Sequence, residues 1–98
     1  MYKPLPESLT IKTSGVHGLG LFADQDIKQA TNLGMSHMKI RDTIFRTPLG
    51  GFINHANEGN VIKVKFYDEI YKTKWNLVTV KDIKKGEELT VRYTFYKV

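Results

Sequence analysis

The chain has 98 residues, a length that fits one small domain and argues against two independent cores. Hydrophobic residues make up 41% and charged residues 26%, which excludes a disordered chain. The lack of cysteine excludes a disulfide scaffold, a thiolate zinc site and a cysteine nucleophile, and a net charge of +5 favours either an acidic partner or a solvated lysine-rich face.

The positive charge is concentrated in the second part of the chain. Residues 1–60 carry six basic and five acidic side chains, whereas residues 61–98 carry nine and five. Because these lysines alternate with acids, a solvated face is the simpler interpretation. No apolar run approaches the roughly 18 residues of a membrane span, and residues 1–6 lack the apolar core of a signal peptide. We therefore expect a soluble intracellular protein, in the cytoplasm of a host cell or in the nucleus, with no membrane partner.

The alternation of apolar and polar residues predicts a mostly β domain. A first strand is expected at 8–12, and 18–23 is typical of a glycine turn that enters a second strand. Further strands are predicted over residues 61–67, 75–80 and 89–96. No window of a dozen residues carries a helical stripe, so we expect one helical turn at most.

An internal repeat relates two distant segments. Residues 26–33 read Asp-Ile-Lys-Gln-Ala-Thr-Asn-Leu, and residues 82–89 read Asp-Ile-Lys-Lys-Gly-Glu-Glu-Leu. Each segment has an isoleucine of core type, a polar turn and a following strand. Two copies are too few for a solenoid, so the repeat predicts two similar β-units packed in one domain.

Three glycines, Gly15, Gly18 and Gly20, lie within residues 14–20. Glycine allows positive φ and the close approach of a ligand to the backbone. The segment lacks the final glycine and helix of a dinucleotide-binding fingerprint, and it lacks the lysine of a phosphate-binding loop. Taken alone, it indicates a tight turn better than a ligand site.

The histidines at 17, 37 and 55 lie twenty and eighteen residues apart, without the short spacing of a metal site. The methionines beside His37 are soft ligands, but a core or edge position is the simpler interpretation of that stretch. We therefore expect no metal.

Two further places put polar groups on apolar segments. Phe52-Ile53 runs directly into Asn54-His55, an arrangement that anchors two polar side chains on buried backbone. Tyr93 falls on the apolar face of the last predicted strand, where a buried hydroxyl needs a partner. A capped loop explains the first feature as well as a binding site does, and a structural tyrosine is the simpler explanation of the second.

Taken together and in this order, these segments resemble the SET-domain family of protein-lysine methyltransferases. Residues 18–23 resemble the family's first glycine motif, 52–55 with Asn60 its asparagine–histidine motif, and 80–90 its turn into the last strand. The match spans residues 9–96 and is similar to the minimal stand-alone SET domains of viruses and bacteria. It implies a fold of several short β-sheets with a knot-like C-terminal crossing.

The resemblance implies methyl transfer from S-adenosylmethionine to the ε-amine of a lysine in a protein or peptide substrate. It places the backbone of Gly18, Leu19 and Gly20 beside the methionine part of this cofactor. It places Asn54 at the amino-acid end of the cofactor and His55 at its adenine.

By the same resemblance, Tyr93 is the catalytic residue, with its hydroxyl beside the transferred methyl group. Tyr96 is a substrate-binding candidate, as a wall of the lysine channel or of the adenine pocket. The chain departs from the family pattern at Gly51, Ala56, Gly59 and Thr94. It also lacks the zinc-binding segment that follows the tyrosine in many members. We therefore expect a single SET domain over residues 1–98, and a homo-oligomer in which a second subunit supplies the missing wall.

Two alternatives remain. A SET-like module without catalysis would bind a peptide or nucleic acid through its basic second part, although the presence of Asn54, His55 and Tyr93 together favours an enzyme. A small β-barrel would bind nucleic acid by stacking aromatic side chains beside lysines. The residues that fit this pattern are Lys63, Lys65, Tyr67, Tyr71 and Lys72. Nucleic acid is thus a secondary candidate partner.

Overall fold

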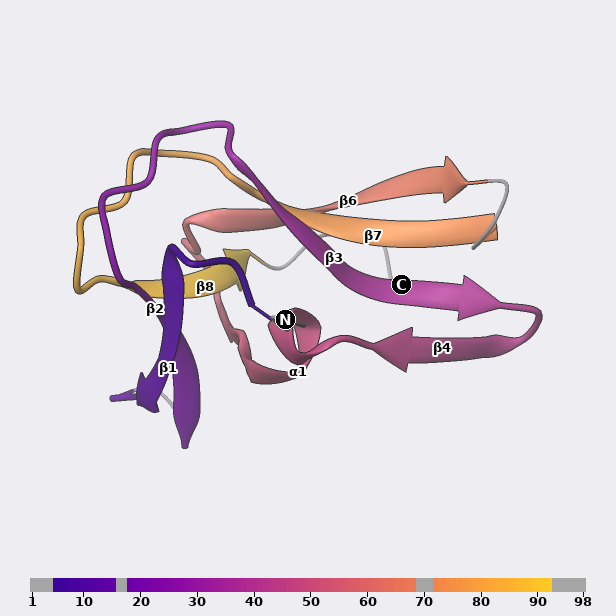
Figure 1. Ribbon diagram of the computed structural model, residues 1–98, viewed down its shortest axis with the longest axis horizontal. Helices are drawn as coiled ribbons and strands as arrows, with labels where there is room; N and C mark the ends of the chain where they lie inside the picture. Colours follow the sequence, from indigo (N-terminus) through magenta and orange to yellow (C-terminus); the bar gives the residue numbers. More distant parts are fainter. Residues whose placement is uncertain (1–4, 16–17, 69–71, 93–98) are drawn as a thin grey trace.

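The computed structural model describes residues 5–15, 18–68 and 72–92, and these form a mostly β domain (Figure 1). The predicted fold class is thereby confirmed. The elements of the described part, in chain order, are β1 (Leu9–Thr13), β2 (Leu19–Ala23), β3 (Asn32–Ile40), β4 (Thr43–Arg46), α1 (Pro48–Phe52), β5 (Asn54–Ala56), β6 (Val61–Asp68), β7 (Lys72–Thr79) and β8 (Glu88–Arg92).

The strands predicted from alternation are present as β1, β6 and β7, and the glycine turn leads into β2. β8 matches the start of the strand predicted at 89–96, and the end of that prediction lies outside the described residues. β3 begins where the repeat predicts a strand after the polar turn of residues 26–33, although alternation did not indicate it, and β4 has no counterpart among the predicted strands. Register shifts interrupt the alternation in β3, and all four residues of β4 are exposed, so neither carries a pattern of period two.

The helix α1 is short and is fixed at its start by Thr47. The Thr47 hydroxyl caps the helix by accepting a hydrogen bond from Gly50 N at 3.4 Å, and it donates to Met35 O of β3 at 2.7 Å. Pro48 stands in the first turn, where no helical hydrogen bond is lost. A helix of five residues is too short to show a hydrophobic stripe. Within the described residues, no helix has the length and apolar character needed to cross a membrane.

The strands pair in the order β1-β2-β8-β6-β7-β3-β4, and β5 joins as a parallel partner of β8. In the described part this sheet runs open from β1 to β4, so the β-barrel alternative is wrong. β8 pairs antiparallel with β2 and parallel with both β5 and β6. The knot-like crossing stays a prediction, because residues 93–98 lie outside the described residues.

The short connection between β5 and β6 holds β8 through side-chain and backbone contacts. Asn60 Nδ2 donates to Glu88 O at 3.0 Å, and Asn60 Oδ1 accepts from Thr90 N at 2.9 Å. The Arg92 guanidinium donates from Nε to Gly59 O at 3.2 Å. Gly59 lies so close to β8 that a Cβ at this position would be 2.5 Å from Thr90 O. These contacts form a clasp around β8, made by residues 59 and 60.

The internal repeat forms a reciprocal pair. Ile27 and Ile83 exchange two backbone hydrogen bonds of 2.8 Å. Asp26 Oδ1 accepts from Lys85 N, and Asp82 Oδ1 accepts from Gln29 N, both at 2.8 Å. Each aspartate therefore caps the turn of the other copy, and the two similar units pack together as the repeat predicts.

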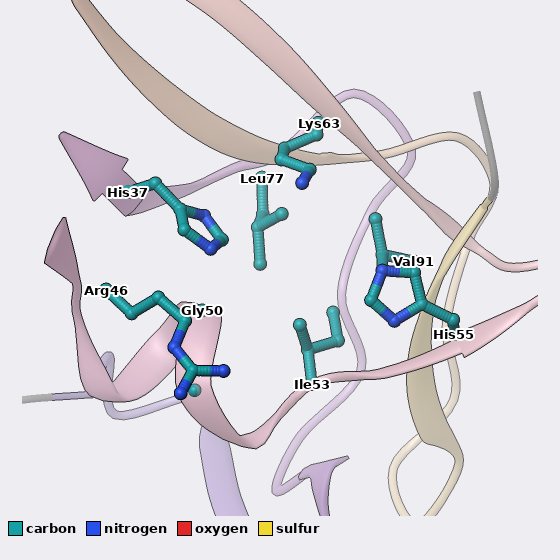
Figure 2. Close-up of a pocket in the computed structure, with 9 residues that line it drawn as sticks. His37, Arg46, Gly50, Ile53, His55, Lys63, Leu77 and Val91 are labelled. Atoms are coloured by element: carbon teal, nitrogen blue, oxygen red, sulfur yellow. The ribbon is translucent and has the colours of Figure 1, made fainter. Parts of the chain in front are cut away.

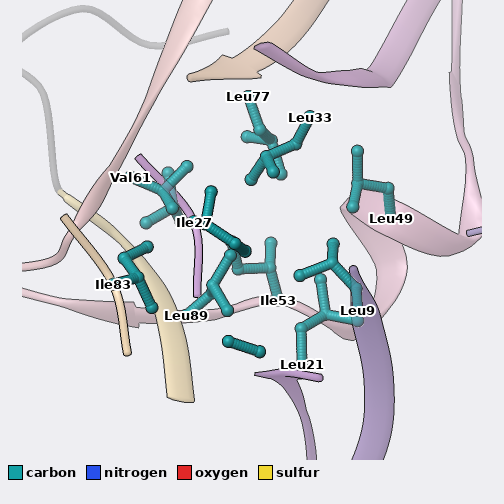
Figure 3. Close-up of a cluster of buried hydrophobic side chains, with 12 residues drawn as sticks. Leu9, Leu21, Ile27, Leu33, Leu49, Ile53, Val61, Leu77, Ile83 and Leu89 are labelled. Atoms are coloured by element: carbon teal, nitrogen blue, oxygen red, sulfur yellow. The ribbon is translucent and has the colours of Figure 1, made fainter. Parts of the chain in front are cut away.

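The core lies where the two repeat units, α1 and the central strands meet (Figure 3). Ile27 and Ile83 are both buried in it, beside Leu21 and Leu89, which are fully enclosed. The buried cluster consists of Leu9, Leu21, Ala23, Ile27, Leu33, Leu49, Ile53, Val61, Leu77, Ile83, Leu89 and Val91. Because Ile53 and Val91 belong to this core, the residues beside them on β5 and β8 are held on a rigid base.

Substitution of Gly59 by Ala tests the clasp. The added methyl group would meet Thr90 O at 2.5 Å and Arg92 N at 2.7 Å, and these backbone atoms have little freedom to move. We expect the free energy of unfolding to fall by about 1–3 kcal/mol, the usual cost of overpacking. Thermal unfolding followed by circular dichroism measures the change.

Gly51→Ala is the matched control, because nothing lies within 4 Å of the Cβ position of residue 51 and alanine favours a helix. Equal melting temperatures for the two variants would show that the clasp does not hold β8.

Candidate functional site

The glycine turn predicted from the sequence is present and ends at the start of β2. Ser14 N donates to Gly18 O at 2.7 Å, which closes the turn. Gly18 has a φ of +48°, a conformation that side-chain-bearing residues rarely adopt. The turn therefore favours glycine at 18, and both Gly18 and Leu19 are exposed.

The carboxylate of Glu88 joins this turn to β5. Asn54 Nδ2 donates to Glu88 Oε2 at 2.9 Å and to Leu19 O at 3.2 Å. The Ser14 hydroxyl lies 2.8 Å from each oxygen of the same carboxylate. Hydrogen bonds to a charged acceptor are the stronger kind. Glu88 therefore fixes three segments that are distant in sequence, at residues 14–20, 54 and 88.

Gly20 leaves the space that these side chains occupy. A Cβ at residue 20 would overlap Glu88 Oε2 and would lie 3.1 Å from Asn54 Nδ2. The close approach at this glycine is thus made by two side chains of the chain itself. Any larger residue at position 20 would push Asn54 and Glu88 apart.

A pocket of about 220 Å³ lies on the side of β5 to which His55 points (Figure 2). Asn54 and His55 are neighbours in a strand, so their side chains leave it on opposite faces. The lining includes apolar side chains from the core, namely Ile53, Leu77 and Val91. The other lining side chains carry nitrogen, and they are His37, Arg46, His55 and Lys63.

His37 is held in one orientation and kept neutral. The Ser36 hydroxyl donates to Trp75 O at 3.1 Å and lies 2.9 Å from His37 Nδ1. Because the hydroxyl proton is used on Trp75, His37 Nδ1 is the donor to Ser36 and Nε2 carries the lone pair. The imidazole packs edge-to-face on Trp75. Burial, helped by Lys63, Arg46 and His55, lowers the pKa of His37 to about 4.

The other titratable groups of the pocket respond to the same surroundings. Burial lowers the pKa of the Lys63 ammonium from its ordinary value. Burial, and then the charge of Lys63, lowers the pKa of His55. The described lining contains no Asp or Glu. The charge in this pocket is therefore positive, and its two imidazoles favour the neutral form.

Residues 35–94 match the family model of the SET domain, which is more than half of the chain. The chain belongs to the SET-domain family. A comparison with curated proteins finds no match.

Solved structures of SET proteins share this fold. A Plasmodium falciparum protein named as a candidate histone methyltransferase has 14% identity and a TM-score of 0.77, over 94% of this chain and 97% of that chain. Polycomb Repressive Complex 2 of Chaetomium thermophilum, in an autoinhibited conformation bound to S-adenosylmethionine, has 21% identity and a TM-score of 0.71. That match covers 88% of this chain but only 15% of the other. At such identities the likeness concerns the fold alone.

The SET domain brings together most of the cofactor-binding residues predicted for it. Leu19, Gly20 and Asn54 meet at Glu88, and Gly18 is joined to the same cluster through Ser14. His55 lies on the other face of β5 and lines the pocket. The predicted catalytic Tyr93 and the predicted substrate-binding Tyr96 lie outside the described residues. Within the described residues, no group of three His, Asp or Glu side chains could hold a metal ion.

The structure adds residues to which sequence patterns gave no role in this site. Glu88 bonds to residues 34 and 74 positions away, so no local pattern marks it. Arg46 stands in a strand without alternation, and Lys63 is one of several lysines that alternate along β6. Among the pocket residues on β3, β4 and β6, only His37 had drawn notice as a candidate ligand, because methionines lie beside it.

The titration of His37 tests the electrostatics of the pocket. Because burial and nearby cations oppose its protonation, we expect the ring to stay neutral until the pH falls to about 4. The unfolded chain takes up this proton near pH 6.5, so this group makes stability fall as the pH drops from about 6.5 to about 4. Nuclear magnetic resonance of the ring protons measures the pKa.

Lys63→Met should raise the pKa of His37, since it removes a neighbouring cation and keeps an apolar stem in place. A pKa of His37 that does not move in this variant would place the Lys63 ammonium away from the ring.

Proposed function

We propose that this SET domain transfers a methyl group from S-adenosylmethionine to the ε-amine of a lysine in a protein or peptide substrate. The observation that carries the proposal is the meeting of the glycine turn, Asn54 and Glu88 in a chain of this family. A known SET structure with the same fold is bound to S-adenosylmethionine, which supports the choice of cofactor.

The groups around Glu88 suit the amino-acid end of this cofactor. That end carries an ammonium and a carboxylate, and the Glu88 carboxylate and Leu19 O are acceptors suited to the ammonium. The Asn54 amide offers both a donor and an acceptor, and its place is set by its hydrogen bonds to Glu88 and Leu19. We propose that Gly18, Leu19 and Gly20 supply the backbone against which this end lies.

When bound, S-adenosylmethionine supplies an electrophilic methyl group on a sulfonium sulfur. The protein then has to present a neutral amine in line with this methyl group and to keep water away. A site held on the buried core beneath β5 and β8 favours such alignment. Val91 lines the pocket and stands two residues before Tyr93 in the sequence. We propose that the hydroxyl of Tyr93 orients the amine and that Tyr96 contacts the substrate. The lysine would first lose one proton to solvent. Its nitrogen would then bond to the methyl carbon as the bond from that carbon to sulfur breaks, and the sulfur would keep the electron pair and leave as a neutral thioether.

Calorimetric titration with S-adenosylmethionine, combined with two variants, tests this function. Asn54→Ala removes a donor from the Glu88 carboxylate, so we expect cofactor affinity to fall by about tenfold or more. Tyr93→Phe should keep cofactor affinity while the rate of methyl transfer falls by about a hundredfold or more. Methyl transfer is followed by mass spectrometry of lysine-containing peptides.

Asn57→Ala is the matched control, because Asn57 is exposed in the turn after β5. Saturable binding that Asn54→Ala loses and Asn57→Ala keeps would support the site. If the folded protein does not bind S-adenosylmethionine, the function is that of a non-catalytic module that binds a peptide or nucleic acid.

We also propose that the protein forms a homo-oligomer. The hairpin of β3 and β4 supports this, since β4 is the last strand of the sheet order and Ile40, Ile44 and Phe45 are 43–46% exposed. An unpaired edge with apolar side chains is a common site of association. Light scattering should give a multiple of the chain mass, and Phe45→Lys should lower it. A monomeric mass at a concentration where the protein is active would contradict this proposal.

A further inference from the structure

The pocket lined by His37, Arg46, His55 and Lys63 is built by the sheet itself. His37 of β3 lies opposite Arg46 of β4, and Lys63 of β6 lies opposite Leu77 of β7. Directly opposite residues share one face of a sheet, so these side chains gather on the face that α1 and β5 approach. Figure 2 shows Lys63 and Arg46 reaching the hollow from opposite sides.

The two cations of this pocket are not neutralised by the part of the chain that the structure describes. No Asp or Glu lines the pocket, and neither Lys63 nor Arg46 has an ion-pair partner among the described residues. Lys63 is also half-buried, which weakens its hydration. Like charges held in a hollow with apolar walls attract an anion more strongly than the same charges on an open surface.

The shape and chemistry of the pocket favour a carboxylate on a short apolar stem. Arg46 can bind both oxygens of a carboxylate, and the Lys63 ammonium can bind one more lone pair. Ile53, Leu77 and Val91 provide apolar contacts for methylene groups. An aspartate or glutamate side chain has both parts, and a volume of about 220 Å³ is enough to hold it.

The pocket is one residue away from the proposed cofactor site. Asn54 contacts Glu88 on one face of β5, and His55 lines the pocket on the other face. Val91, in the same lining, precedes Tyr93 by two residues. A substrate bound at the proposed site would therefore lie beside β5, the strand that also lines the pocket with Arg46 and Lys63.

We propose that this pocket binds the carboxylate of an aspartate or glutamate of the protein substrate, close in sequence to the lysine that accepts the methyl group. The inference rests on the proposed function and adds the class of substrate. Acidic neighbours of the lysine are attracted by Arg46 and Lys63, whereas basic neighbours are repelled. The enzyme therefore selects lysines in acidic surroundings.

Binding of short synthetic peptides tests the inference without any need for catalysis. The peptides share one lysine and differ only in a single Glu, Gln or Arg moved through the positions around it. Affinity is measured by fluorescence anisotropy, with and without S-adenosylmethionine. At the best position we expect Glu to bind about tenfold more tightly than Gln, and Arg to bind most weakly. The Glu peptide should also raise the pKa of His37 from about 4, since an anion in the pocket favours the imidazolium.

Lys63→Met and Arg46→Met should each remove most of the preference for Glu over Gln. Lys28→Met is the matched control, because it makes the same change of charge at an exposed turn before β3. Arg46 is exposed, so its variant should keep the wild-type melting temperature even if Lys63→Met does not.

Equal affinity for the Glu and Gln peptides would overturn the inference, and so would a preference that survives in Arg46→Met. A loss of S-adenosylmethionine affinity in the pocket variants, with peptide affinity unchanged, would also overturn it and assign the cations to the cofactor. Methyl transfer without any preference for Glu leaves the proposed function intact and removes only this inference. Preference for Glu in binding, with no methyl transfer to any peptide, removes the proposed function and keeps the carboxylate pocket.

Discussion

The hydrogen bonds of one carboxylate, that of Glu88, hold together the residues of the proposed cofactor site. Its oxygens accept from Asn54 and Ser14, and the backbone oxygen of the same residue accepts from Asn60. The residue therefore ties the glycine turn, β5 and the clasp of residues 59 and 60 to the start of β8. Gly20 contributes by having no side chain where this carboxylate lies. Removing the carboxylate would leave these donors half-buried and without their charged acceptor, which is more costly than the bonds alone suggest.

The repeat supplies a second, symmetrical constraint. Asp26 and Asp82 each cap the turn that the other copy forms, while Ile27 and Ile83 pair between them. The turns before β3 and β8 are thereby joined, although they are more than fifty residues apart. β3 carries His37 and β8 carries Glu88. The paired turns therefore set where two strands begin, one that lines the pocket and one that contributes to the proposed cofactor site.

Local patterns predicted the parts of the fold that depend on local physics. Alternation predicted β1, β6 and β7, since one face of each packs on the core, and the repeat predicted two packed units. The family resemblance predicted that residues 18–20 and Asn54 belong together, and their contacts through Glu88 agree with this. It placed His55 at the adenine of the cofactor, largely through its backbone, and the structure shows that the His55 side chain lines the pocket on the other face of β5.

The remaining features depend on partners that are far apart in the chain. Glu88 gains its role from Ser14 and Asn54, and the basic pocket arises only when β3, β4, β5 and β6 are assembled. In the sequence, Arg46 is one cation among fifteen with nothing to distinguish it, and Lys63 was noted only as one of several lysines that lie beside aromatic residues. A pocket of like charges is a property of the register between strands, and that register is not visible in composition or in period-two alternation.

The late place of β8 in the chain has a consequence for how the protein becomes functional during its synthesis. The turn at 14–20 and β5 are made early, but Glu88 and Val91 are added only near the end of the described sequence. Until β8 leaves the ribosome and pairs with β2, β5 and β6, the growing chain has neither the carboxylate nor the full wall of the pocket. Strand pairings of such long sequence separation form slowly. A nascent chain of this protein therefore has neither the proposed cofactor site nor the complete pocket until its last described strand has docked.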